Sequence, residues 1–203
     1  MLNIGFIGAG GIARHHATRL AEIKGVRILA VADVATEAAQ GFASDFGAEH
    51  YATDYRHILD LPDLDAIWVC TPTFQHPTPV IAAAKAGKHV FCEKPMALNL
   101  SDARRMVRAC ESAGVRLTIG FVRRFDAQWG KLKQIVQSGA VGRPVIWRFA
   151  SGGRPGPAWF RDVDKTYRIG PLPPSAPTTA PTYVYRPPWF ARLSAGRVVL
   201  QSE

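Results

Sequence analysis

The chain has 203 residues, of which 47% are hydrophobic, which is enough for a packed core in one domain or in one domain and part of another. Its net charge of +9 comes from scattered basic residues without a Lys/Arg-rich run or an aromatic platform motif, so we expect no nucleic-acid partner. No segment approaches the roughly 20 apolar residues of a membrane span, and no charged and then apolar leader opens the chain, so we expect a cytoplasmic protein without a membrane partner.

Short apolar runs alternate with amphipathic segments from residue 3 to about residue 120, which is the pattern of βαβ units. Strands are predicted at residues 3–8, 27–33, 66–70, 89–92 and 116–119. Helices are predicted at residues 11–23, 36–46, 78–86 and 101–112, the last with Ser101 as its N-cap and Gly114 as its stop. Because parallel crossovers are right-handed, this order predicts an α/β fold with a doubly wound parallel sheet of the Rossmann type.

The regular pattern weakens in the last third of the chain. A helix is predicted at residues 127–138, ending at Gly139, and residues 144–151 read as one more strand. Residues 167–203 hold seven prolines, one acid and no Lys, and they show neither helical nor alternating periodicity. We therefore expect a first domain at residues 1–121, the start of an incomplete second α+β domain at 122–166, and an irregular Pro-rich tail at 167–203.

Three cysteines, Cys70, Cys92 and Cys110, are widely spaced, and each lies within an apolar strand-like or helix-like pattern. This spacing matches neither a disulfide framework nor a set of metal ligands. We expect buried, reduced thiols and no metal site.

A glycine-rich loop, G-A-G-G-I-A, fills residues 8–13 directly after the first predicted strand and opens the first helix. In a G-x-G-x-x-A loop the first glycine permits a tight turn, the second lets the backbone approach a pyrophosphate, and the alanine keeps helix and strand close. The helix N-terminus supplies N–H donors and a favourable dipole. The residues expected to contact a dinucleotide here are Gly8, Gly10, Gly11, Ile12 and Ala13. Taken alone, the loop also fits a glycine turn without a ligand.

Asp33 strengthens the nucleotide interpretation, because it ends the second predicted strand about 20 residues beyond the loop, where a carboxylate binds the adenosine ribose hydroxyls. Its charge would repel a 2′-phosphate, and no Arg or Lys follows it in residues 34–40. The sequence therefore predicts NAD as the cofactor and favours it over NADP.

Thr71 and Pro72 end the strand predicted at residues 66–70, which should lie beside the first strand where the strand order reverses. Sheets of this kind bind ligands at that point, so both residues are predicted to contact the cofactor. His76 follows in the same loop. It is either a wall of the nicotinamide pocket or an ordinary loop histidine.

Glu93 and Lys94 come directly after the strand at residues 89–92, so Lys94 should leave the carboxyl edge of the sheet next to the cofactor. A lysine there can bind a substrate hydroxyl and exchange a proton with it; a solvated surface lysine is the alternative. Glu93 either tunes or holds Lys94, or forms a structural ion pair. The Lys94-Pro95 bond is a candidate for a cis peptide, since proline lowers the cost of the cis form at an abrupt turn.

Three longer runs carry a resemblance to a known family: G-K-H-V-F-C-E-K-P at residues 87–95, G-F-V-R-R-F-D at 120–126 and G-A-V-G-R-P at 139–144. With them, residues 1 to about 166 resemble the glucose-fructose oxidoreductase / inositol dehydrogenase / MocA (Gfo/Idh/MocA) family. The resemblance implies an NAD(P)-dependent dehydrogenase that passes hydride between nicotinamide and a sugar or cyclitol hydroxyl or carbonyl. It makes Lys94 a catalytic residue for proton transfer. It also places Arg124 toward the substrate, with a structural salt bridge as the alternative.

The sequence departs from that family after W-F-R-D at residues 159–162. The resemblance implies a D-x-G-x-H-x-x-D motif there, whose histidine and first aspartate complete the catalytic site, and then a large sheet through which the family usually assembles. No histidine follows His89, so this motif is absent from the sequence. We expect neither the family's homo-oligomer nor turnover from this chain.

Two hypotheses explain the departure. In the first, a family dehydrogenase lost its reading frame near Thr166 and keeps a cofactor domain with an unrelated tail. In the second, the chain is a non-catalytic NAD-binding sensor or scaffold. Shifting one base near codon 166 should restore the motif only under the first. A third interpretation, a relative of homoserine dehydrogenase or biliverdin reductase, shares the glycine loop but does not account for the run at residues 87–95.

Overall fold

A computed structural model describes residues 1–143, and residues 144–203 lie outside the described residues. The chain divides into two compact units with the boundary between Val122 and Arg123, and each unit is described by itself. The strand predicted at residues 144–151 and the tail predicted at 167–203 fall outside the described part of the chain. The domain division at residues 121 and 166 stays a prediction.

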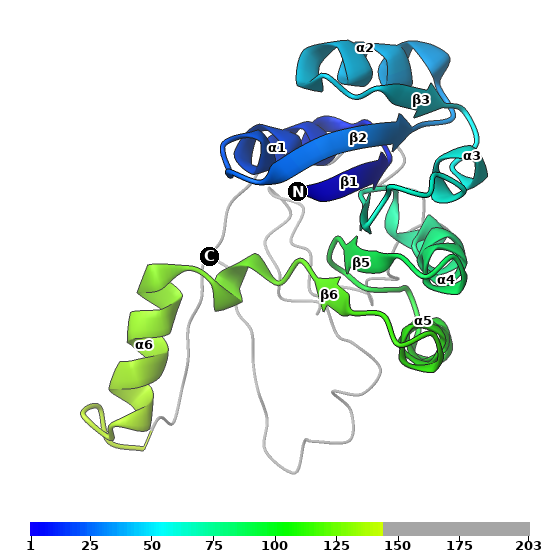
Figure 1. Cartoon of the computed structure of the whole chain (residues 1–203). Coiled ribbons are helices and arrows are strands. Elements are labelled where there is room, and N and C mark those ends of the chain that lie inside the picture. Colours follow the sequence, from blue (N-terminus) through cyan, green and yellow to red (C-terminus); the bar gives the residue numbers. More distant parts are fainter. Residues whose placement is uncertain (144–203) are drawn as a thin grey trace, which may run out of the picture. The chain divides into compact units, whose positions relative to one another are not determined.

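A parallel sheet of six strands forms the centre of the first unit (Figure 1). The strands are β1 (Leu2–Ile7), β2 (Val26–Ala32), β3 (His50–Ala52), β4 (Ala66–Val69), β5 (His89–Cys92) and β6 (Leu117–Ile119). Their spatial order is β3-β2-β1-β4-β5-β6, and each neighbouring pair is parallel. The chain builds outward from β1 to β3 and restarts beside β1 with β4. This is the doubly wound Rossmann arrangement that the sequence predicts.

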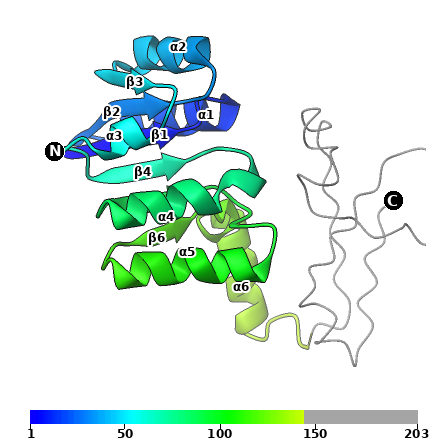
Figure 2. The ribbon, with the colours of Figure 1, turned by 90° about the vertical axis from the view of Figure 1, so that its right-hand side faces the viewer.

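Helices cover both faces of the sheet (Figure 2). One face carries α1 (Gly11–Ala21) and α2 (Thr36–Phe46), and the other carries α3 (Arg56–Leu59), α4 (Pro77–Lys85) and α5 (Leu100–Ser112). A short 3-10 turn, η1 (Thr73–Gln75), precedes α4. Each face has its own apolar cluster: Phe6 and Phe42 belong to the one on the side of α1 and α2, and Ile67 and Met106 belong to the one on the opposite side. Because both faces are buried, the strands read in sequence as continuous apolar runs.

The ends of α5 confirm one prediction and correct another. The helix begins at Leu100, and its N-cap is Asn99, not Ser101. Asn99 is extended, and its Oδ1 accepts a hydrogen bond from the Asp102 N–H at 2.8 Å, as a capping side chain does. Gly114, with φ +67°, follows the C-cap and stops the helix as predicted.

The cysteines are buried and free, as the sequence predicts. Burial raises the pKa of the Cys70 thiol well above its ordinary value, and it raises that of Cys92 to about 12. Among residues 1–143, no group of three or more His, Cys, Asp or Glu side chains could hold a metal ion. No helix within that range is long and apolar enough to cross a membrane.

The described part of the second unit contains the helix predicted there. A 3-10 turn, η2 (Val122–Arg124), spans the boundary, and α6 (Ala127–Gln137) follows it. Asp126 caps α6, because its Oδ1 accepts hydrogen bonds from the N–H groups of Gln128 and Trp129 at 2.9 and 3.1 Å. Gly139, with φ +73°, comes directly after the C-cap Ser138. Arg124 belongs to this unit, and its role toward a substrate stays a prediction.

Candidate cofactor site

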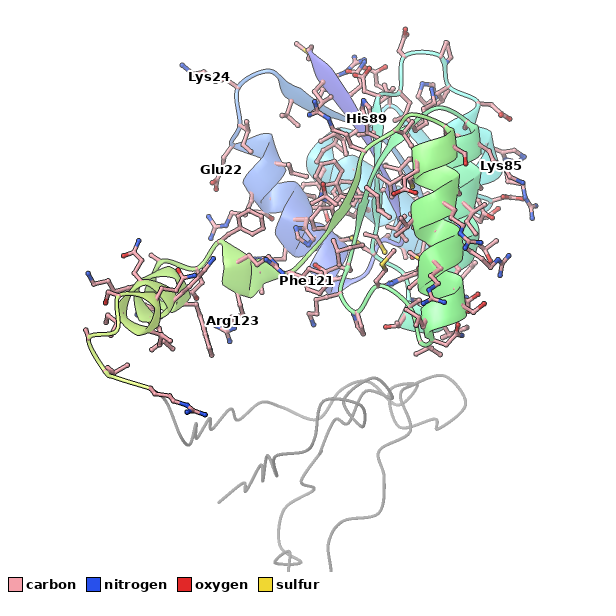
Figure 3. All side chains as sticks on the ribbon, turned by 90° about the horizontal axis from the view of Figure 1, so that it is seen from below. Glu22, Lys24, Lys85, His89, Phe121 and Arg123 are labelled. Carbon is pink, nitrogen blue, oxygen red and sulfur yellow. The ribbon has the colours of Figure 1, made fainter. Side chains whose placement is uncertain are left out.

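The loops that carry the predicted site residues meet at one edge of the sheet, because parallel strands place all their carboxyl ends together. Figure 3 marks the two edges: His89 begins β5 and Phe121 follows β6, and they lie at opposite ends of the strands. The loops after β1, β2, β4 and β5 share the edge at which Phe121 lies. The predicted residues on these loops are Gly8, Gly10, Gly11, Asp33, Thr71, Pro72, Glu93 and Lys94.

The glycines of the loop after β1 have two different functions. Gly8 has φ +99°, and a Cβ added there would lie 2.8 Å from the Cys70 carbonyl oxygen, so the fold itself requires a glycine. Gly10 has ordinary extended backbone, and a Cβ on Gly10 or Gly11 would meet nothing within 4 Å. Gly8 therefore closes the turn against the end of β4. Gly10 and Gly11 leave the backbone uncovered on the side that a ligand would approach.

The N-terminus of α1 is open for an anion. Gly10 is its N-cap and offers no side-chain cap, and no acid lies in its first turn. The first N–H groups of a helix have no partner within the helix, and the helix dipole makes this end positive. Ala13 is fully buried between α1 and the sheet, while Ile12 is 44% exposed at the start of the helix. The loop thus presents backbone donors where a pyrophosphate can accept them.

Asp33 joins the loop after β2 to the glycine loop. Its Oδ2 accepts a hydrogen bond from the Ala9 N–H at 2.8 Å, and its Oδ1 accepts one from the Ala35 N–H at 3.0 Å. A carboxylate has about four acceptor positions, so each oxygen keeps one for another donor. Asp33 can therefore fix the glycine loop and still receive hydroxyl groups.

Thr71 and Pro72 lie at the switch point between β1 and β4, as predicted. The Thr71 Oγ1 is buried and has no hydrogen-bond partner within residues 1–143. A buried hydroxyl without a hydrogen-bond partner is uncommon in proteins, so a bound ligand that supplies the missing partner would explain it. Together with the open Gly10 and the open end of α1, it makes this edge fit a dinucleotide.

His76 is 1% exposed and lies between two loops of the site. Its Nε2 is 2.8 Å from the Thr71 carbonyl oxygen, and its Nδ1 is 3.0 Å from the Pro95 carbonyl oxygen. Burial lowers the pKa of His76, although both carbonyl contacts and the charge of Glu93 act to raise it. A neutral imidazole carries one N–H, so His76 lies against the loops after β4 and β5 but donates to only one of these carbonyl oxygens. Its predicted place in a nicotinamide pocket stays a prediction.

Glu93 is 8% exposed, and its carboxylate has two partners. Its Oε1 lies 2.7 Å from His16 Nε2, and its Oε2 accepts a hydrogen bond from the Lys94 backbone N–H at 2.9 Å. Burial alone would raise the pKa of Glu93. The hydrogen bonds from His16 and Lys94 and their charges outweigh burial and hold that pKa below its ordinary value. The carboxylate therefore stays charged, held by α1 and by the following peptide.

Lys94 emerges after β5 at the carboxyl edge, as predicted, and its side chain is exposed. Glu93 contacts Lys94 through the Lys94 backbone N–H, and no ion pair joins the two side chains in the described part of the chain. The Lys94-Pro95 peptide is cis, as the sequence suggests. Whether Lys94 acts on a substrate stays a prediction.

Sequence reasoning missed two residues of this edge. His16 is on α1 three residues after Ala13, so it shares the inward face with Ala13 and Ala17. A polar residue on an otherwise small, buried helix face is the signal that could have found it. Gly120 was quoted only for the resemblance, yet a Cβ there would lie 3.0 Å from Glu93 Oε1. Its lack of a side chain makes room for that carboxylate.

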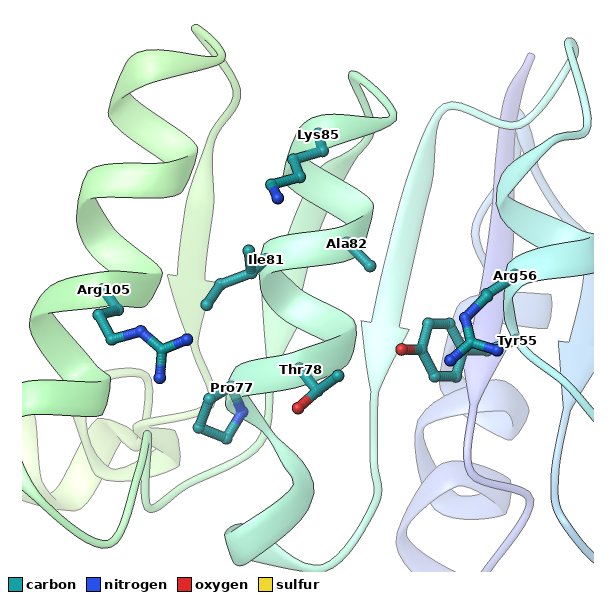
Figure 4. Close-up of a pocket in the computed structure, with 8 residues that line it drawn as sticks. All are labelled: Tyr55, Arg56, Pro77, Thr78, Ile81, Ala82, Lys85 and Arg105. Atoms are coloured by element: carbon teal, nitrogen blue, oxygen red, sulfur yellow. The ribbon is translucent and has the colours of Figure 1, made fainter.

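A separate groove of about 310 Å³ runs along α4 (Figure 4). Its lining residues are Tyr55, Arg56, Pro77, Thr78, Ile81, Ala82, Lys85 and Arg105, none of which belongs to the glycine loop. Arg56 and Arg105 in this lining form exposed ion pairs with Asp54 and Asp102, and the groove contains neither a glycine-rich turn nor the N-terminus of α1. The groove is therefore a weaker candidate for a nucleotide than the carboxyl edge.

The strand order, the glycine loop at the first turn and the carboxylate after β2 define a dinucleotide-binding domain of the Rossmann type. The model of the Gfo/Idh/MocA family, described as an oxidoreductase family with an NAD-binding Rossmann fold, matches residues 2–121. The chain belongs to this family.

The relatives of the chain include several cyclitol dehydrogenases. A myo-inositol 2-dehydrogenase of Thermotoga maritima is 41% identical over 150 residues, which are 74% of this chain and 45% of that relative. The structure of a myo-inositol 2-dehydrogenase from Lactobacillus plantarum aligns with a TM-score of 0.69 at 31% identity, covering 73% of this chain and 44% of that one. Scyllo-inositol dehydrogenase from Lactobacillus casei, with bound NAD(H) and scyllo-inositol, aligns with a TM-score of 0.66 at 28% identity, covering 70% and 42%. The chain thus spans less than half the length of these relatives.

Proposed function

We propose that this chain binds NAD at the carboxyl edge of its sheet and serves an oxidoreductase that acts on a hydroxyl or carbonyl group of a sugar or cyclitol. The observation that carries the proposal is the uncapped N-terminus of α1 beside Gly10, with the Asp33 carboxylate next to it. The membership of the chain in a family of NAD-binding oxidoreductases supports it.

The residues of the β1–β2 half would hold the adenosine and pyrophosphate parts. The backbone N–H groups of α1 would donate to the pyrophosphate, which Gly10 lets approach, and the free acceptor positions of Asp33 would receive the ribose hydroxyls. A carboxylate repels a 2′-phosphate, and Val34 after it is exposed and uncharged. These features favour NAD over NADP.

The residues of the β4–β5 half would serve the reacting groups. Bound NAD supplies a hydride acceptor for oxidation of a carbinol carbon. Lys94 Nζ, as a neutral amine within hydrogen-bond reach, would take up the proton that the hydroxyl oxygen loses in this oxidation, and would return it in the reverse reaction. Thr71, Pro72 and His76 would border the nicotinamide, with the Thr71 hydroxyl as the free donor or acceptor. Arg124 would face the substrate.

A second candidate function is nucleotide binding without turnover. It is favoured by the absence of any histidine after His89 in the sequence, since the family resemblance implies a second catalytic histidine. A missing general acid or base typically costs about 100- to 10,000-fold in rate. Both candidates predict a bound nucleotide. Assays of NAD reduction with inositol and glucose separate them, because turnover above background supports only the first.

The test of nucleotide binding is a titration of the full chain with NADH, followed by fluorescence. Saturable binding below millimolar concentration is expected, and its absence would overturn the proposal.

In Gly10→Ala the new methyl group meets no protein atom but covers the open backbone. The Kd for NADH should therefore rise by about tenfold or more, which corresponds to a loss of about 1.4 kcal/mol in binding free energy. Gly41→Ala is the matched control, since it adds the same methyl group inside α2 with ordinary contacts and should leave the Kd unchanged.

A further inference from the structure

The Lys94 backbone N–H donates to a side chain where the sheet ends. The last sheet-like hydrogen bonds after β5 are those from Glu93 N–H to the Val69 carbonyl at 3.0 Å and from Gly120 N–H to the Cys92 carbonyl at 2.9 Å. The next N–H, that of Lys94, donates to Glu93 Oε2. The direction in which Lys94 leaves the sheet therefore depends on how the Glu93 carboxylate is oriented.

The Glu93 carboxylate is oriented in turn by His16. The His16 and Glu93 side chains are 24% and 11% exposed, and His16 Nε2 reaches Glu93 Oε1 at 2.7 Å. The His16 ring also packs edge-on against Phe91 of β5, with centroids 5.1 Å apart, which fixes its position. Gly120 leaves the space that the carboxylate fills. The histidine thus links the first helix to the peptide of Lys94.

We infer that His16 is a positioning residue for Lys94, acting through the Glu93 carboxylate. The inference rests on the proposed role of Lys94. A buried carboxylate that loses one of its two partners is costly, so without His16 the Glu93 side chain should turn toward water or take up a proton. Either change weakens the hydrogen bond that holds the Lys94 N–H.

The segment that follows Lys94 has a separate contact. The carbonyl oxygen of Pro95, one peptide beyond the cis Lys94-Pro95 bond, lies 3.0 Å from His76 Nδ1. The amino side of Lys94 therefore depends on His16 through Glu93, whereas the chain after Pro95 lies against His76. Removal of His16 should weaken only the contact on the amino side of Lys94, so the change in structure should be confined to Lys94 and Glu93.

The experiment measures amide hydrogen exchange and the amide chemical shift of Lys94 by NMR in the full chain, without cofactor. In His16→Leu the Lys94 amide should exchange about tenfold faster or more, and its shift should move. In His16→Gln, whose Nε2 can take the place of the imidazole Nε2, both should return toward wild type. His15→Leu is the matched control, because His15 is the neighbouring exposed histidine of α1 and should change neither.

A Lys94 amide in His16→Leu that exchanges as in wild type would overturn the inference. So would His16→Gln behaving like His16→Leu, because a purely packing role of the ring would not be rescued by an amide. If His16→Leu fails to fold, His16→Ala serves instead, because it removes the same contact to Glu93 with a smaller side chain; exchange of the Lys94 amide at the wild-type rate in that variant would overturn the inference. The measurement needs no NADH, so a failure of NADH binding would count against the proposed function and not against this inference.

Discussion

After β1 the chain places three glycines in residues 8–11 and leaves backbone donors open, whereas after β5 it buries a carboxylate and holds it with a histidine. The first half of the edge thus depends on the absence of side chains. The second half depends on buried polar side chains that fix one peptide. A site for a pyrophosphate needs close approach to backbone N–H groups, while a reactive side chain needs one defined direction. Substitutions in the glycine loop should therefore fail by steric conflict, and substitutions after β5 should fail by lost hydrogen bonds.

Gly8→Ala should give the largest effect on stability. The new Cβ would lie 2.8 Å from the Cys70 carbonyl oxygen in a backbone conformation with φ +99°, so both contact and torsion oppose it. A loss of about 3 kcal/mol in the free energy of unfolding is expected, measured by urea unfolding. Gly10→Ala should change that free energy by no more than about 0.5 kcal/mol. Equal stability of the two variants would contradict the division of roles between these glycines.

The second half should make stability depend on pH through His76. Its pKa in the folded chain is lowered by burial below the ordinary value of 6.5, so the unfolded chain binds more protons. The stability that His76 contributes is therefore fully present above pH 6.5 and is lost as pH falls through the folded pKa. His76→Gln cannot titrate, so its free energy of unfolding should decline less between pH 7 and pH 5. Identical slopes in the two proteins would show that His76 is not buried in its neutral form.

Glu93 should add a separate loss at lower pH. Its folded pKa lies below the ordinary value of 4.5, so its contribution is present above that pH and declines as pH falls further. Glu93→Gln should flatten the curve in this acidic range, and because the Glu93 charge acts to raise the pKa of His76, its removal should make the decline between pH 5 and pH 7 no shallower. A flattening between pH 5 and pH 7 instead would contradict this assignment.

Most of the sheet could be predicted from the sequence because each buried parallel strand is a distinct apolar run. β3 was missed because three residues, of which His50 and Tyr51 are exposed, show no period. The helix caps were less predictable. Serine and asparagine are both common N-caps, so the sequence could not decide between Ser101 and Asn99, and only the extended backbone of Asn99 identifies it as the N-cap. The glycine loop, Asp33 and Lys94 stood out because each follows directly after a strand. His16 did not, since its partner Glu93 is distant in sequence and meets it only across the folded edge.

Asp33→Asn should change cofactor preference more than stability. The amide keeps the size of the carboxylate but removes the charge that repels a 2′-phosphate, and its NH2 group replaces one of the two oxygens that now accept from Ala9 and Ala35. The ratio of NADPH to NADH dissociation constants should fall by about tenfold, which corresponds to about 1.4 kcal/mol. Titration with both nucleotides measures it. An unchanged ratio would mean that Asp33 does not face the adenosine ribose.

Lys94→Ala should give the smallest effect on stability of these substitutions, although Lys94 lies in the half of the edge that depends on polar contacts. The Lys94 side chain is exposed and forms no ion pair within the described residues, while the contacts that fix this edge belong to its backbone N–H and to the neighbouring Glu93 and His76. Alanine keeps that N–H, so the free energy of unfolding should stay within about 0.5 kcal/mol of wild type. NADH affinity should fall by less than about threefold, because the pyrophosphate and ribose are held at the other half of the edge. Any NAD reduction measured with a polyol should disappear. A large loss of stability would show instead that the lysine side chain itself holds the edge together, and that it is structural rather than a group presented to a substrate.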